Sequence, residues 1–148
     1  MVDRDAAVPG PEELDFWLGE WVCSWEGGHG RNQISREFQG HVVVERFESL
    51  APERWSGMSL SSYDERRGWR QTWVDSTGNY WAFEGGPHPE GFAFTTTEVE
   101  NGLDIDKRMV FFDRESDAFR WRWERSSDGG GAWRSLWTID YRRAAGER

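Results

Sequence analysis

Histidine and cysteine are the side chains of this sequence most suited to metal binding or nucleophilic catalysis. His29, His41 and His88 are scattered along the chain, and no two of them have a spacing of two or four residues that would place both on one face of a strand or helix. Cys23 is the only cysteine, so it can form neither an internal disulfide nor a multi-cysteine metal site. We expect no metal and no cofactor, and the sequence identifies no catalytic residue.

A polar side chain between two indoles is the first candidate for a binding site. Trp69, Gln71 and Trp73 alternate with polar residues, so all three are predicted to share the inward face of a strand. A buried amide without a hydrogen bond is destabilised by a few kcal/mol, on the order of 2–7. Gln71 therefore needs a partner, which could be another side chain, a fixed water or a polar group of a ligand.

The segment of residues 41–49, HVVVERFES, places one ionisable side chain inside the protein whichever face is buried. One phase directs Glu45 inward and the other directs Arg46 inward. A buried charge needs a counter-charge or hydrogen bonds, and either a Glu45–Arg36 pair or an Arg46–Glu84 pair could provide one.

The elements that must position these groups are strands. From Glu20 onward the apolar residues recur with a period of two, and nine segments rich in Gly, Asp, Asn, Ser and Pro divide the chain. This pattern predicts an all-β fold: a single closed, antiparallel, up-and-down β-barrel of about ten strands, because closure removes exposed sheet edges. Residues 11–18 read as a short helix that plugs one end. We expect a disordered tail over residues 1–10 and one barrel domain over 11–143.

Alternation also assigns side chains to faces, although a bulge would exchange the faces downstream. The predicted inward sets are Trp21, Cys23 and Trp25; Met58 and Leu60; Trp69, Gln71 and Trp73; Phe119, Trp121 and Trp123; and Trp133, Trp137, Ile139 and Tyr141. Cys23 should then be a buried, inert thiol. Trp81 or Phe112, if outward, could mark a homodimer patch.

Composition narrows the classes of partner. The chain has 11 tryptophans and a formal net charge of −9. The negative charge disfavours nucleic acid and anionic membranes as partners. The chain shows no secretory h-region and no apolar run long enough to span a bilayer. We expect a cytoplasmic protein.

Three segments carry a resemblance to a known group: FWLGEW (16–21), GMSLSSYDERRGWRQTWVDSTGNYWAFEGG (57–86) and RMVFFDRESDAFRWRWERSSDGGGAWRSLWTIDYRR (108–143). They resemble an uncharacterised bacterial lipocalin-like domain family of unknown function within the calycins, which include the lipocalins and fatty-acid-binding proteins. The resemblance implies a calycin barrel in which Trp21 packs across the closed end, with Arg142 or Arg143 laid over it. It implies no activity. The related nitrobindins bind haem, but their second glycine after the tryptophan and their late histidine have no counterpart after Trp21 or after His88.

The favoured hypothesis is the binding of a small apolar or aromatic molecule inside the barrel. Its predicted lining is Gln71, Trp73, Tyr80, Trp121, Trp123 and Trp137, with Glu45 or Arg46 as a polar anchor. One alternative is a barrel enzyme, such as a cyclase or isomerase, that uses a buried acid or base among Glu45, Glu84 and Tyr80. Another is a structural or interaction module whose interior is filled by side chains. Binding is favoured over catalysis.

Overall fold

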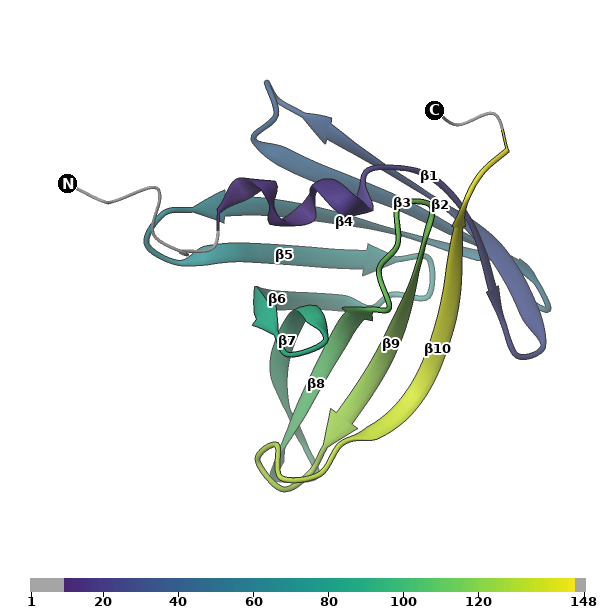
Figure 1. The fold of residues 1–148 in the computed structure, drawn as a ribbon. Helices are drawn as coiled ribbons and strands as arrows, with labels where there is room; N and C mark the ends of the chain where they lie inside the picture. The colour runs from purple at the N-terminus through teal and green to yellow at the C-terminus, as the bar shows by residue number, and fades with distance from the viewer. Residues whose placement is uncertain (1–9, 146–148) are drawn as a thin grey trace.

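The computed structural model describes residues 10–145, so residues 1–9 of the predicted tail lie outside the described residues. The elements in chain order are η1 (Pro11–Trp17), β1 (Gly19–Trp25), β2 (Gly28–Glu37), β3 (Val42–Ala51), β4 (Trp55–Asp64), β5 (Gly68–Asp75), β6 (Tyr80–His88), β7 (Gly91–Glu100), β8 (Leu103–Phe112), β9 (Ala118–Ser126) and β10 (Arg134–Arg143). Each strand pairs antiparallel with its neighbours in sequence, and β1 pairs with β10 to close the barrel (Figure 1). The predicted ten-stranded closed meander is confirmed. None of the described residues forms a helix with the length and apolar character needed to cross a bilayer.

The predicted N-terminal helix is present as the 3₁₀ segment η1, which leads directly into β1 (Figure 1). Pro11 occupies its first turn, where the missing backbone N–H does no harm. Leu14 and Trp17 are buried, and Phe16 contacts the barrel edge-on, with its ring centroid 5.5 Å from that of Phe111. The helix is held by tertiary packing, because a segment this short has little stability by itself.

Trp21 closes the end of the barrel beneath η1. Its indole Nε1 donates a hydrogen bond to the carbonyl oxygen of Trp17 at 2.8 Å. The guanidinium of Arg143 lies 4.3 Å from the centroid of the Trp21 ring, and its Nη1 donates to the carbonyl of Leu18 at 2.9 Å. Of the two arginines considered for this position, Arg143 is the one that covers the indole.

The faces of β1, β5 and β9 follow the predicted alternation. Trp21, Cys23, Trp69, Gln71 and Phe119 are all buried. The sequence left open whether Glu45 or Arg46 of β3 faces inward. In the structure Glu45 is buried with 8% exposure, whereas Arg46 is exposed. The barrel therefore encloses an acid rather than a base.

The predicted inward face of β4 is wrong. Leu60 is 46% exposed, whereas Ser59 and Ser61 are completely buried. The reason is the interior they face, because serine leaves room for indoles and supplies hydroxyls. Ser59 pairs in register with Glu45 of β3, and Ser61 pairs with Gln71 of β5.

Two tryptophans also lie opposite to their predicted faces. The register between β9 and β10 is irregular between Ser135 and Trp137, so Trp133 does not share the inward face of Trp137. Its ring packs on the outside, with its centroid 3.8 Å from the guanidinium carbon of Arg108. Trp81 points inward and stacks on Trp123 with centroids 5.1 Å apart.

Phe112 does point outward, but its ring is only 8% exposed. The guanidinium groups of Arg120 and Arg122 lie 5.2 and 4.7 Å from its centroid. Because Trp81 is inward and Phe112 is covered, neither forms the exposed patch considered for a dimer.

Candidate functional site

A cavity of about 220 Å³ lies inside the barrel. Its lining consists of Glu45, Phe47, Trp55, Trp73, Asp75, Asn79, Trp81, Phe83, Met109, Trp121, Trp123, Trp137, Ile139 and Tyr141. Asp75 is the last residue of β5 and Asn79 lies in the β5–β6 turn, at the end of the strands opposite η1. The cavity therefore occupies the half of the barrel that the helix does not plug.

The tryptophans divide between core and cavity. Trp17, Trp21 and Trp69, near η1, are each 1% exposed and belong to the solid core. The six lining tryptophans are only partly buried, and most of them contact another lining indole. Trp121 and Trp137, for example, meet edge-to-face with centroids 5.5 Å apart. Indoles that pack against each other in this way form stiff walls.

Glu45 is the buried acid of the cavity. Its Oε1 accepts a hydrogen bond from Ser59 Oγ at 2.7 Å, and its Oε2 accepts one from Asn32 Nδ2 at 2.7 Å. Burial raises the pKa of Glu45, and these two hydrogen bonds offset the rise only in part. The fold therefore favours the protonated carboxyl.

The hydrogen bonds of Glu45 extend through Asn32 to Tyr141. Asn32 Nδ2 also donates to the Tyr141 hydroxyl at 3.0 Å. Burial raises the pKa of Tyr141 well above its ordinary value, with further contributions from Cys23 and Glu45. Burial likewise raises the pKa of the Cys23 thiol, so the expected protonated, buried cysteine is what the structure contains.

Asp75 is the second acid of the lining, and its environment is the opposite of that of Glu45. Trp73 Nε1 donates to Asp75 Oδ2 at 2.8 Å. Partial burial alone would raise the pKa of Asp75, but hydrogen bonds from Thr77, Trp73 and Asn79 outweigh it and lower the pKa to about 2. Asp75 is therefore an ionised carboxylate that fixes both the turn and the orientation of a wall indole.

The predicted site residues divide into two groups. The structure brings Glu45, Trp73, Trp121, Trp123 and Trp137 together around the cavity.

Three predicted lining residues lie elsewhere. Arg46 is outside the barrel, and Tyr80 is 66% exposed because its neighbour Trp81 takes the inward position. Gln71 is inward and buried, as predicted, but its Nε2 donates to Ser61 Oγ at 2.9 Å and it does not line the cavity. Its Oε1 has no hydrogen-bond partner among the described residues.

Neither internal ion pair considered for β3 forms. Arg36 instead contacts Asp15 of η1 at 2.6 Å, and Glu84 lies 3.8 Å from Arg67 on the outer surface. The two side chains that donate hydrogen bonds to Glu45, Asn32 and Ser59, are both neutral.

The sequence reasoning missed Trp55 and Trp81 as lining residues. Trp55 follows a proline-containing turn, where alternation gives no phase. Trp81 could have been found from its pairing with Trp73, which is directly opposite it in the β5–β6 ladder.

The basic groups near the cavity wall are already paired. Lys107 of β8 lies 5.6 Å from the centroid of the Trp81 ring. This contact lies beyond the Glu84–Thr95 pair at which the β6–β7 ladder ends. Lys107 Nζ contacts Glu98 at 2.9 Å and Glu100 at 3.0 Å. Burial alone would lower the pKa of Lys107, but its two carboxylate partners raise it. The two carboxylates therefore compensate the positive charge of the Lys107 ammonium group.

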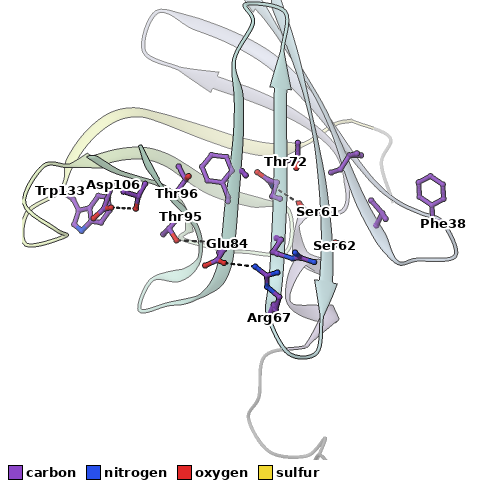
Figure 2. Close-up of a pocket in the computed structure, with 17 residues that line it drawn as sticks. Phe38, Ser61, Ser62, Arg67, Thr72, Glu84, Thr95, Thr96, Asp106 and Trp133 are labelled. Carbon is purple, nitrogen blue, oxygen red and sulfur yellow. Dashed lines mark hydrogen bonds and ion pairs between the residues drawn. The ribbon is translucent and has the colours of Figure 1, made fainter. Parts of the chain in front are cut away.

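A larger groove of about 970 Å³ lies on the outer face of β4–β8 (Figure 2). Its walls include Thr72, Thr95, Thr96 and Asp106, and Figure 2 shows Trp133 at one side of it and Phe38 at the other. It is open to solvent, and its lining mixes polar, charged and apolar side chains, such as Thr72, Arg67 and Leu60. The inner cavity is the better candidate site because its lining is mainly aromatic and apolar.

Among residues 10–145 no group of three or more His, Cys, Asp or Glu side chains is arranged to hold a metal ion. Comparison of the chain with protein-family models and with curated proteins finds no match.

Gly57→Ala is expected to lower the free energy of unfolding by about 1–3 kcal/mol, the usual effect of overpacking. A Cβ at Gly57 would overlap the indole of Trp73, which is held in place by Asp75. Gly86→Ala is the matched control, since a Cβ there meets nothing within 4 Å. Urea unfolding of both variants makes the comparison. Equal midpoints for the two would mean that Trp73 is free to move.

Proposed function

We propose that this protein binds a small apolar or aromatic molecule inside the barrel, with Glu45 as the polar anchor. The observation that carries the proposal is the cavity itself, a volume of about 220 Å³ inside the barrel walled by six tryptophans. Ligand sites are concave and mainly apolar, with a few polar groups that orient the ligand. The lining of this cavity has that composition.

The volume sets the size of the ligand. An apolar cavity of about 150 Å³ accommodates benzene, and drug-sized ligands occupy about 300–1,000 Å³. A volume of about 220 Å³ therefore suits one aromatic ring with a short side chain. It is too small for a long-chain lipid in an extended form.

Nitrobenzene, a quencher of tryptophan emission, is expected to quench the fluorescence of the protein saturably. Met109→Phe, which adds a ring to the cavity lining, should weaken this binding by about tenfold, or about 1.4 kcal/mol. Met58→Phe is the control, because Met58 lies on the outer face. Quenching that rises linearly without saturation, or equal affinities for the two variants, would contradict binding in the cavity.

An enzymatic role is the second candidate, and Glu45 is the observation that favours it. Of the three acids or bases considered, only Glu45 lies beside open volume, whereas Glu84 and Tyr80 are exposed on the outside. A carboxyl with a raised pKa is suited to act as a general acid. Recovery of a bound compound chemically unchanged after prolonged incubation would separate binding from turnover.

We also propose that the chain belongs with the calycin barrels. The arrangement of Arg143 over Trp21, at the point where η1 enters β1, supports this grouping. The grouping is independent of the ligand proposal, which depends only on the cavity.

A further inference from the structure

We infer that the ligand carries a protonated amine, which binds as an ammonium group to the Glu45 carboxylate within the indole cage. This inference rests on the proposed function and specifies the chemistry of the same site. It predicts a cationic ligand with one aromatic ring and a short amine-bearing arm.

The charge of the lining is the first observation. Glu45 and Asp75 both line the cavity, and among residues 10–145 no arginine, lysine or histidine does. Lys107 is bound to Glu98 and Glu100, and Arg125, which is opposite Lys107 on β9, is bound to Glu100. A lining with two acids and no base, inside a chain of net charge −9, disfavours an anion and favours a cation.

The state of Glu45 is the second observation. Its oxygens are held by Asn32 and Ser59 at 2.7 Å, so the carboxyl is fixed in position before a ligand arrives. The ionisable groups that interact with it from across the barrel interior, Cys23 on β1 and Tyr141 on β10, carry no positive charge. The carboxyl thus lacks a cationic partner, and an ammonium group would supply one.

The six indoles are the third observation. The faces of tryptophan rings attract cations, and aromatic cages are a common way to bind ammonium groups. Trp73 is especially suited to this role, because the carboxylate of Asp75 accepts its N–H and adds negative charge to the ring.

The free energy of desolvating the two partners is the fourth consideration, and it also favours an ammonium ligand. Burying an ion pair usually removes water from both partners, and the free energy of this desolvation can exceed that of their attraction. Folding has already buried the Glu45 carboxyl and favours its protonated form, so a bound ammonium group displaces that proton to solvent. Beyond this deprotonation, binding adds the desolvation of the ligand. The carboxylate and the surrounding ring faces offset that term.

The test uses three probes of nearly equal size that differ in charge: benzylamine, benzyl alcohol and benzoate, each titrated into the intact protein at neutral pH by calorimetry. Benzylamine should bind at least about tenfold more tightly than benzyl alcohol, and benzoate should bind most weakly. In Glu45→Gln the advantage of benzylamine over benzyl alcohol should disappear. Glu48→Gln is the matched control, because it removes one carboxylate from the outer surface and should leave the order of the probes unchanged.

The outcomes separate the two proposals. Benzyl alcohol or benzoate binding as tightly as benzylamine to the unmodified protein would overturn the amine inference and leave the cavity-binding function intact. Loss of the benzylamine preference in Glu48→Gln as well would assign it to the overall charge and also overturn the inference. Failure of all three probes, together with nitrobenzene, would remove the proposed function itself.

Discussion

Trp21→Ala is expected to lower the free energy of unfolding by about 3–5 kcal/mol, the range for removing a buried indole from a packed core. Trp21 is 1% exposed, and its ring centroid lies 4.8 Å from that of Phe119. The indole also joins three segments, because it contacts Arg143 of β10 and donates to Trp17 of η1. A loss of this size is a large fraction of the stability of an ordinary domain, about 5–15 kcal/mol.

Trp133→Ala is the control for that experiment, since it removes an indole of the same size from the outer surface. The ring of Trp133 contacts the guanidinium of Arg108 at 3.8 Å, and its loss should lower stability by only about 1 kcal/mol. Chemical denaturation of both variants gives the two free energies. Similar losses would show that the closed end of the barrel is not a packed core.

Glu45→Gln is expected to change the pH dependence of stability. The ordinary pKa of a glutamate is 4.5, and burial raises the pKa of Glu45 in the folded state. Below the ordinary value the carboxyl is protonated in both states, so its contribution to stability is fully present. As the pH rises above that value, the unfolded chain ionises while the folded chain keeps its proton. The free energy of unfolding then falls by about 1.4 kcal/mol per pH unit until the folded pKa is reached.

Glutamine does not titrate, so the variant should lack this component. Its stability relative to the unmodified protein should therefore rise as the pH increases from about 4.5. Urea unfolding at several pH values measures the difference. Glu48→Gln, which alters an exposed carboxylate bound to Arg31, should show no rise of this kind. Parallel curves for Glu45→Gln and the unmodified protein would mean that Glu45 is ionised in the folded state.

Most of the fold was predictable because it depends on local signals. Turn residues gave the number of strands, and alternation gave the inward faces of Trp21 and Cys23 in β1 and of Trp69 and Gln71 in β5. The helix start at Pro11 is likewise a local signal. Closure followed from the absence of any other partner for the two edges.

The candidate site was predictable only in part, because alternation gives the period of a strand but not always its phase. In β4 the hydrophobic residues Met58 and Leu60 are a misleading guide, since the interior needs the small hydroxyls of Ser59 and Ser61 beside Glu45 and Gln71. Serine is ordinarily a surface residue, so composition favours the wrong face.

The sequence by itself determined that this protein is an acidic, tryptophan-rich, closed β-barrel with a short helix at its start. Only the tertiary structure decided that Glu45 rather than Arg46 faces inward, that Trp81 completes the cavity wall and that Trp133 leaves it. It also decided that the barrel is solid at one end and hollow at the other. The reason is that a cavity is the volume left over when side chains from many strands have packed together. That volume depends on register and bulges between strands, which no single stretch of sequence contains.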